Sequence, residues 1–254
     1  RLRPQEIGLA ASIGCDHLQV MVPLKVAVFS TGNEVLNPGD SLFEGAIYDS
    51  NRYTLMQLLK SVGCEVVDLG ILEDNPKIIA DALLSATIKY DLILTSGGVS
   101  TGEEDHVRKV VENEGSLLFW RLAIKPGRPV ALGQINDTVF IGLPGNPVAA
   151  MVTFLQVARP IILKLSGAND TVPKLFSVQS DFSYKKKLHR REYVRVQIKK
   201  NGNGKLIAKK YKREGAGILS SMVFADGFVE LSEDIVNVEK GDFVNYIPFS
   251  ELGL

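Results

Sequence analysis

Residues 95–106 read TSGGVSTGEEDH and combine a glycine-rich turn, several hydroxyl side chains and a run of carboxylates. A glycine-rich turn that opens a helix presents backbone N–H groups to an anion, and Ser96 and Ser100 would add hydroxyl donors. The carboxylates at 103–105 would repel a phosphate group unless a divalent cation bridged the two. The loop therefore predicts an anion site that works with Mg²⁺, with an ordinary turn whose acids cap a helix as the alternative.

Two other interpretations of this loop fail on its neighbouring residues. The stretch 98–102 spells G-x-S-x-G, but a serine hydrolase needs an acid and then a histidine further along the chain. His106 lies too close, on a helix that leads away, and His189 lies among Lys and Arg side chains. A P-loop needs Lys and then Ser or Thr after its second glycine, whereas Glu103 follows Gly102 here.

Two further loops could bind anions. The stretch 124–129, IKPGRP, places Lys125 and Arg128 on a turn stiffened by proline, which suits a small oxyanion or phosphate. The stretch 142–150, GLPGNPVAA, offers backbone N–H groups at a helix start, with Asn146 as cap or ligand. Each could also be a plain turn.

Acidic side chains follow the ends of two predicted strands and open a helix. Glu34 lies in STGNEV, Asp74 follows LGILE, and Asp49 precedes a helix for which Ser50 is a candidate N-cap. Taken singly, each is more typical of a cap or a solvated acid. Together they would form an acidic ring around a phosphate pocket, which serves metal-assisted phosphoryl or nucleotidyl chemistry.

These loops must be positioned by strands and helices that alternate along the chain. The pattern predicts strands at 25–30, 65–70, 91–98, 117–120, 129–133 and 138–143, and helices at 50–63, 76–89, 103–115 and 147–165. This order predicts a three-layer α/β/α domain with a mainly parallel sheet over residues 24–170. Ligand loops gather at the carboxyl ends of such strands, so we expect the loops at 31–34, 70–75, 95–105 and 143–147 to converge.

The hydrophobic pattern of the sequence changes after residue 170. Short alternating runs separated by turn residues, with the hairpin signal NGNG at 201–204, predict a small β-barrel domain over residues 171–254. Residues 1–23 contain one short helical stretch and do not amount to a domain.

Composition excludes some partners. The chain has 254 residues, is 45% apolar and has a formal net charge of zero, so we expect no bulk attraction to nucleic acid. We interpret the basic runs at 185–191 and 209–213 as solvated strand faces. We see no apolar run near the roughly 18 residues that span a bilayer, so we expect no membrane partner. Cys64 is predicted to be a buried free thiol, which suits a reducing compartment.

Several long motifs occur together and in order. FSTGNEV, IYDSNR, GCEVVDLGI, ILTSGGVSTGEEDHV, LAIKPGRPVALG and GLPGNPVAAMVTF closely resemble the molybdopterin molybdenumtransferases, the MoeA and gephyrin E-domain family. The C-terminal REYVRV, GILSSMVFADGFVEL and GDFVNYIPF resemble that family's last domain. The resemblance runs over essentially the whole chain.

The resemblance implies a function. Members insert molybdate into adenylylated molybdopterin with Mg²⁺ and release AMP, as cytoplasmic homodimers of four-subdomain chains. The upstream molybdopterin adenylyltransferase is then an expected partner. Residues 1–23 would be a remnant of two missing N-terminal subdomains. Because those subdomains contribute to the family's cleft, we expect this chain alone to lack a complete one.

The resemblance also implies roles for particular residues. Glu34 and Asp105 would hold the metal or activate the pyrophosphate, and Asp74 matches a further functional acid. The remaining residues would hold the substrates: Thr31, Gly32, Asp49, Ser50, Ser96, Gly97, Gly98, Val99 and Ser100 for the pterin and its phosphate, Arg121, Lys125 and Arg128 for molybdate or phosphate, and Pro144, Gly145, Asn146 and Pro147 for the wall.

The chain departs from the family pattern at three positions. Asn33 replaces a common aspartate, Ala149 replaces a common serine, and Arg128 replaces a lysine while keeping its charge. We expect these changes to affect rate more than reaction type. The alternatives are a molybdopterin adenylyltransferase, which shares the α/β fold and the TSGG loop but lacks the barrel, and a non-catalytic scaffold of the gephyrin type.

Overall fold

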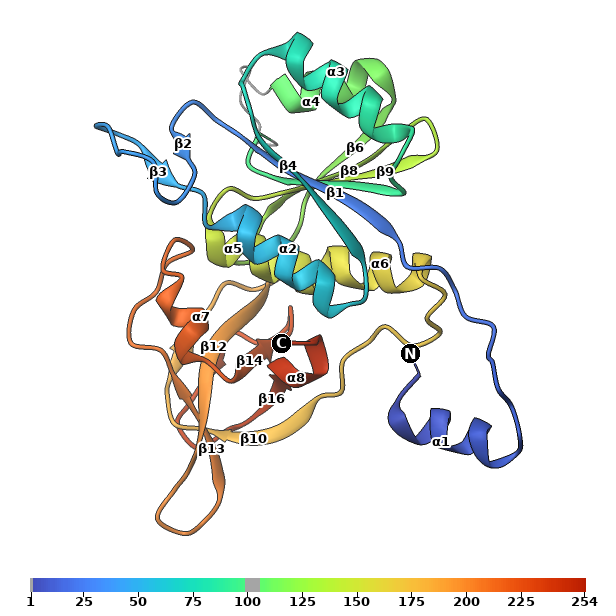
Figure 1. The fold of residues 1–254 in the computed structure, drawn as a ribbon. Coiled ribbons are helices and arrows are strands. Elements are labelled where there is room, and N and C mark those ends of the chain that lie inside the picture. Colours follow the sequence, from blue (N-terminus) through green and yellow to red (C-terminus); the bar gives the residue numbers. More distant parts are fainter. Residues whose placement is uncertain (1, 99–105) are drawn as a thin grey trace.

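The computed structural model describes residues 2–98 and 106–254. The predicted site residues Val99, Ser100 and Asp105 therefore lie outside the described residues. Figure 1 shows an α/β domain joined to a small barrel, with the N-terminal segment extending along one side. That segment contains helix α1 (Pro4–Ser12), none of whose residues is buried.

A six-stranded sheet forms the centre of the first domain. Its order is β4-β1-β5-β9-β8-β6, and the first four strands are parallel, while β8 runs antiparallel to both neighbours. The strands are β1 (Lys25–Thr31), β4 (Glu65–Leu72), β5 (Leu92–Ser96), β6 (Ser116–Arg121), β8 (Pro129–Ile135) and β9 (Thr138–Leu143). The mainly parallel sheet confirms the predicted fold class.

Strand β1 shows why the domain has three layers. Val26 and Val28 belong to the hydrophobic core on one face of the sheet, whereas Ala27 and Phe29 belong to the core on the other. Because side chains alternate along a strand, a continuous apolar run requires cover on both faces. Helix α2 (Asn51–Ser61) covers the first face, and α3 (Pro76–Thr87) and α4 (His106–Glu114) cover the second (Figure 1).

The long helix after β9 changes its winding before a proline. It consists of α5 (Pro147–Thr153), a π-helical turn (Phe154–Ala158) and α6 (Arg159–Leu165). Pro160 has no N–H group to continue the α-helical ladder, and the wider turn comes directly before it, with Arg159 N bonded to the carbonyl of Phe154. The kink that Pro160 predicts is thus accompanied by a π-helical turn.

The same helix contradicts the expectation that no apolar run is long enough to span a bilayer. Residues 147–165 form a 19-residue helix, and an 18-residue stretch of it has a mean hydropathy of 1.6, which is sufficient by length and composition. Arg159 and Lys164 interrupt the run, yet the average stays high. Half of the segment is buried, because it lies between the sheet and the barrel and joins both to one hydrophobic core (Figure 1).

Five strands close the second domain into a barrel. They are β10 (Phe176–Ser180), β12 (Arg191–Lys200), β13 (Leu206–Lys210), β14 (Gly227–Leu231) and β16 (Phe243–Pro248), and pairing of β13 with both β10 and β12 completes the ring. The hairpin predicted at 201–204 connects β12 to β13. The remaining elements are short: β2 (Val35–Leu36), β3 (Ile47–Tyr48), β11 (Tyr184–Lys185), β15 (Asn237–Val238), α7 (Ser220–Phe224) and α8 (Phe249–Leu252).

One strand of the first domain is built into the barrel. Strand β7 (Ile124–Lys125) lies in the predicted basic turn and pairs in parallel with β12, so that Lys125 lies opposite Glu192. The pairing fixes this turn between the two domains. Sequence patterns did not predict it, because a two-residue strand carries no periodicity.

Candidate functional site

A cavity of about 490 Å³ lies at the carboxyl ends of the parallel strands. We call it the strand-end cavity. It brings together eleven of the predicted site residues: Thr31, Gly32, Glu34, Asp49, Ser50, Asp74, Ser96, Gly97, Gly98, Gly145 and Pro147. The loops that were expected to converge therefore do so, because strand register places Ser30, Ser96 and Leu143 side by side at the ends of β1, β5 and β9.

Several buried polar atoms in this cavity lack hydrogen-bond partners among the described residues. Thr31 and Ser96 are 8% and 6% exposed, and neither hydroxyl makes a hydrogen bond to residues 2–98 or 106–254. His106, which sequence reasoning set aside, also lines the cavity, and its Nδ1 has no partner within the same ranges. Leaving a buried polar group unsatisfied costs roughly 1–3 kcal/mol, so such groups typically await a ligand or water. Donors of this kind suit phosphate oxygens or the polar edge of a heterocycle.

The glycine turn after β5 needs its glycines. Gly97 and Gly98 have φ angles of +86° and +62°. A Cβ atom on Gly98 would lie 2.8 Å from Val107 Cγ2 and 2.9 Å from Thr31 Cγ2. The turn therefore packs closely against both β1 and α4, and a larger residue would push it away from the cavity.

One of the acids expected around the phosphate pocket, Asp49, is already paired with a buried arginine, Arg52. Asp49 is 4% exposed; one carboxylate oxygen accepts a hydrogen bond from Arg52 N at 3.0 Å, and the other lies 3.5 Å from the guanidinium. Ser50 is the N-cap residue of α2, as predicted, but its side chain makes no capping bond, and Asp49 bonds to the first turn instead. Glu34 and Asp74 remain as the acids that line the cavity without an ion pair among the described residues.

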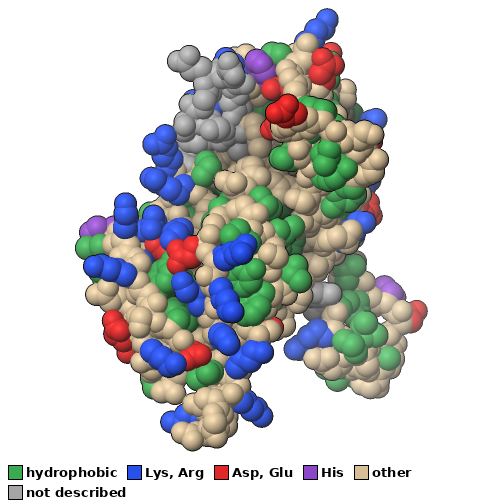
Figure 2. All heavy atoms as spheres, turned by 90° about the vertical axis from the view of Figure 1, so that its left-hand side faces the viewer, with side chains coloured by type: hydrophobic (Ala, Val, Ile, Leu, Met, Phe, Trp, Pro, Cys, Tyr) green, Lys and Arg blue, Asp and Glu red, His purple; other side chains and the backbone are tan. Residues whose placement is uncertain are grey.

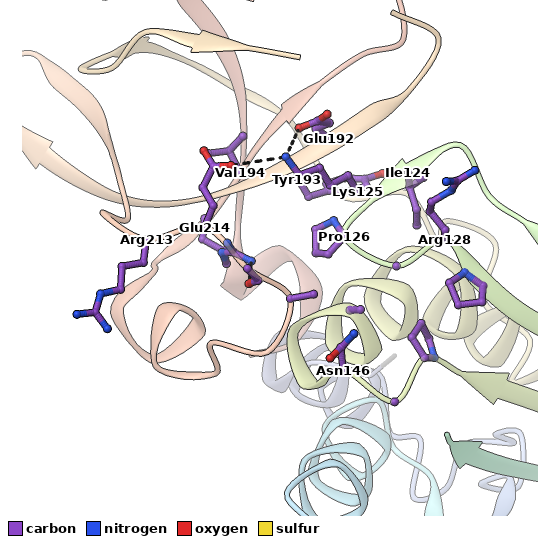
Figure 3. A pocket seen from close by; sticks show the side chains of 18 of the residues that line it. Ile124, Lys125, Pro126, Arg128, Asn146, Glu192, Tyr193, Val194, Arg213 and Glu214 are labelled. Atoms are coloured by element: carbon purple, nitrogen blue, oxygen red, sulfur yellow. Dashed lines mark hydrogen bonds and ion pairs between the residues drawn. The ribbon is translucent and has the colours of Figure 1, made fainter. Parts of the chain in front are cut away.

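A second cavity, of about 730 Å³, lies between the sheet domain and the barrel. We call it the interdomain cavity. Figure 3 shows Lys125 and Arg128 on one side, the loop carrying Arg213 and Glu214 on the other, and Asn146 below them. The described lining contains more bases than acids: Lys125, Arg128, Arg190, Arg195, Lys210 and Arg213 against Glu34, Glu192 and Glu214. The excess positive charge suits a small anion.

Lys125 is held by the barrel. Its ammonium donates to Tyr184 Oη at 3.1 Å and lies 3.4 Å from Glu192 Oε2 and 3.7 Å from Glu214 Oε2. Burial raises the pKa of Tyr184, and its hydrogen bond to Glu192 raises it further. Arg128, on the same turn, is exposed and makes no ion pair among the described residues. The two predicted oxyanion ligands therefore differ. The charge of Lys125 is balanced by nearby carboxylates, whereas Arg128 has no ion-pair partner among the described residues.

Sequence reasoning missed the basic residues that the barrel contributes. Arg195 is 9% exposed; Nη1 donates to the carbonyl of Gly215 at 3.3 Å, and Nε has no hydrogen-bond partner in the part of the chain that the structure describes. Burial lowers the pKa of its guanidinium from the usual value for arginine. Arg190 and Lys210, which belong to runs interpreted as solvated faces, also line the cavity, so for them that interpretation is wrong. Figure 2 shows Lys and Arg gathered over the barrel near this junction.

The proline-rich turn is packed onto the long helix. Gly127 has a φ of +102°, and a Cβ atom there would lie 2.2 Å from Thr153 Oγ1. At the start of α5, the N–H group of Val148 donates to the carbonyl of Ala216 in the barrel at 2.9 Å, and Asn146 makes no capping bond. The N–H group of Val148 is therefore occupied and is not available to an anion.

The two cavities adjoin. Glu34, Gly97, Gly98 and Gly145 line both of them. The carbonyl of Gly145 also accepts a hydrogen bond from Asn51 Nδ2 at 2.7 Å, which ties the shared wall to α2. Of the other predicted residues, Pro144 and Asn146 line the interdomain cavity, whereas Arg121 lines neither.

The described residues contain no group of three or more His, Cys, Asp or Glu side chains that could hold a metal ion. Mg²⁺ needs fewer protein ligands, because it typically takes one or two carboxylates and completes its shell with phosphate oxygens and water. Glu34 and Asp74, beside hydroxyls and with no Lys or Arg in the described lining of the strand-end cavity, fit such a site. Asp105 lies outside the described residues.

Two family models match the chain. The "Probable molybdopterin binding domain" matches residues 27–164, and the "MoeA C-terminal region (domain IV)" matches residues 177–249. The first match covers the domain that holds the strand-end cavity, and the second covers most of the barrel.

Known proteins are similar over most of this chain. A molybdopterin molybdenumtransferase of Haemophilus influenzae is 39% identical over 99% of this chain and 63% of its own length. One of Nostoc sp. is 35% identical over 66% of this chain and 39% of its own.

Solved structures agree. The molybdopterin biosynthesis MoeA protein of Pyrococcus horikoshii has a TM-score of 0.80 at 27% identity, covering 98% of this chain and 60% of its own. The chain therefore spans less than two thirds of the length of these relatives, and it belongs to the MoeA family of proteins built on the molybdopterin binding domain.

Proposed function

We propose that this chain is the substrate-binding part of a molybdopterin molybdenumtransferase, which inserts molybdate into adenylylated molybdopterin. The observation that carries the proposal is the shared wall between two cavities of opposite character. The strand-end cavity offers unpartnered hydroxyls to a pterin phosphate, and the interdomain cavity offers cations to an oxyanion. Glu34, Gly97 and Gly98 would then lie where the two substrates meet.

Each group has a defined task in this proposal. Ser96 and Thr31 would donate to the pterin phosphate, while Arg195 and Arg128 would orient molybdate toward the dithiolene. Glu34 and Asp105, with Asp74 nearby, would hold Mg²⁺. When bound, Mg²⁺ would neutralise phosphate charge and stabilise the charge that develops as AMP leaves.

The barrel supports this proposal over a molybdopterin adenylyltransferase. Arg190, Arg195 and Lys210 come from barrel strands or the segments beside them and supply much of the positive charge of the interdomain cavity. An α/β domain alone would leave the Lys125 turn without these neighbours.

The direct test supplies adenylylated molybdopterin, molybdate and Mg²⁺ and measures AMP release together with molybdenum bound to the pterin. Because the relatives are longer, the same assay is run on this chain and on the chain joined to the N-terminal region of the Haemophilus influenzae relative. We expect pterin binding by both and turnover by the longer form. Absence of pterin binding by a folded chain would sink the proposal.

Assembly is part of the proposal as well. We expect the full-length protein to be a cytoplasmic homodimer that receives its pterin from an adenylyltransferase. Light scattering of the longer form measures whether it is a dimer. A pull-down with the adenylyltransferase measures whether the two proteins interact. A monomer with full turnover would contradict the dimeric cleft.

A further inference from the structure

Glu214 lies between two lysines at the interdomain cavity. Its Oε1 accepts a hydrogen bond from Lys210 Nζ at 2.8 Å, and its Oε2 lies 3.7 Å from Lys125 Nζ. Both ammonium groups also lie over the ring of Tyr184, at 5.0 Å and 5.6 Å from its centroid. The carboxylate of Glu214 thus lies where an external oxyanion would have to lie in order to contact both ammonium groups.

The other barrel carboxylate of this cavity is bound differently. Glu192 is 1% exposed and accepts hydrogen bonds from Tyr184 Oη at 2.7 Å and Arg190 Nε at 3.0 Å. Separating a buried carboxylate from several hydrogen-bond partners costs much free energy. The side chain of Glu214 is 52% exposed, so water can solvate it as soon as it leaves the lysines. An entering anion could displace Glu214 but not Glu192.

The charge and anchoring of Glu214 also suit displacement. The hydrogen bond from Lys210 lowers the pKa of Glu214, and the charges of Lys210 and Lys125 lower it further, so the carboxylate is ionised at neutral pH. The backbone that follows is fixed, because the carbonyls of Gly215 and Ala216 accept hydrogen bonds from Arg195 and Val148. A rotation of the side chain, with the loop in place, is sufficient to break the contacts of Glu214 with both lysines.

We propose that Glu214 is a displaceable counter-ion that an oxyanion must replace to reach Lys125 and Lys210, and that it thereby limits oxyanion affinity. The inference rests on the proposed function, which assigns molybdate to this cavity. In the structure the carboxylate contacts both ammonium groups and balances part of their charge. With molybdate bound, it turns outward into solvent.

The test is equilibrium binding of molybdate alone, at physiological ionic strength, to the wild-type chain and to Glu214→Gln. Neutralising the competitor should tighten binding about three- to fivefold, the range expected from removing one half-exposed ion pair. Glu233→Gln is the matched control: Glu233 is 50% exposed, pairs with Arg191 and lines neither cavity, and the change in net charge is the same. We expect no tightening there.

The outcomes separate the two proposals. A wild-type chain that binds molybdate, with Glu214→Gln no tighter or with Glu233→Gln tighter by the same factor, overturns the counter-ion role and leaves the proposed function standing. Failure of the wild-type chain, Glu214→Gln and a second variant, Glu214→Ser, to bind molybdate overturns the assignment of the cavity and the inference with it. Thermal unfolding of each variant confirms that the chain is folded.

Discussion

The strand-end cavity and the interdomain cavity share a wall but are built differently. The strand-end cavity is formed within one domain by loops, backbone and small hydroxyl side chains, and its described lining has acids but no Lys or Arg. The interdomain cavity is formed by two domains, and long charged side chains from the barrel meet the Lys125 turn there. The first cavity is formed within one domain and has acids in its described lining, whereas the second is formed between two domains and has an excess of bases in its described lining.

This difference indicates how each cavity would hold an anion. A phosphate in the strand-end cavity would meet Glu34 and Asp74 and so requires a cation to offset them. An oxyanion in the interdomain cavity meets cations directly but must compete with Glu192 and Glu214 for them. We therefore expect metal dependence on one side of the wall and salt dependence on the other.

The largest effect should come from the shared wall. Glu34→Gln removes one charge with little change of shape, and we expect a loss of turnover of about 100-fold or more, because metal and both substrates would meet there. Turnover measured against Mg²⁺ concentration should also show weaker metal dependence. Thermal unfolding should be unchanged, since Glu34 makes no ion pair among the described residues. Wild-type turnover would remove Glu34 from the metal site.

Arg195→Met tests the basic cavity by itself. Losing a charge-assisted hydrogen bond should weaken molybdate binding about tenfold or more and leave pterin binding unchanged. Arg191→Met, on the same strand, is the control, because Arg191 pairs with Glu230 and Glu233 and lines neither cavity. Equal losses in both variants would mean that general charge, and no local contact, holds molybdate.

Ser96→Ala tests the strand-end cavity. The Ser96 hydroxyl has no hydrogen-bond partner among the described residues, so removing it should leave thermal stability unchanged or slightly raised. Pterin binding should weaken about two- to tenfold, the worth of one hydrogen bond. Thr95→Val is a close control, since Thr95 is also buried and unpartnered but lines neither cavity. A weaker pterin affinity in that control would contradict a local role for Ser96.

The two cavities also differ in how far the sequence predicts them. The strand-end cavity could be anticipated because buried parallel strands end at one edge and place Thr31, Glu34 and Ser96 together whatever the rest of the chain does. The interdomain cavity could not. Residues 194–199 read VRVQIK, and this alternation places Arg195 on the polar face of β12, which is typical of a solvated side chain, whereas the structure buries Arg195 beside the cavity. Its orientation depends on packing between domains that are distant in sequence.

The sequence predicts where the helices begin better than it predicts which side chains bond to their first turns. Ser50 is the N-cap residue of α2, as expected, but the bond to the first turn comes from the buried Asp49, which also faces Arg52. At α3 the side chain of Asn75 accepts bonds from Lys77 N and Ile78 N. Propensity therefore predicts the helices, whereas the bonds at their first turns depend on neighbouring side chains.

The smallest effect should come from Arg121, to which the sequence assigned the same role as Arg128. Arg121 lies at the end of β6, opposite Pro129, and lines neither cavity, whereas Arg128 lines the interdomain cavity and carries no ion pair among the described residues. At physiological salt a charge is screened beyond about 8 Å, so Arg121→Gln should change molybdate affinity less than about twofold. Arg128→Gln, with the same change in charge, should weaken it several-fold more. Equal losses would show that the oxyanion site extends beyond the lining of the interdomain cavity to the end of β6.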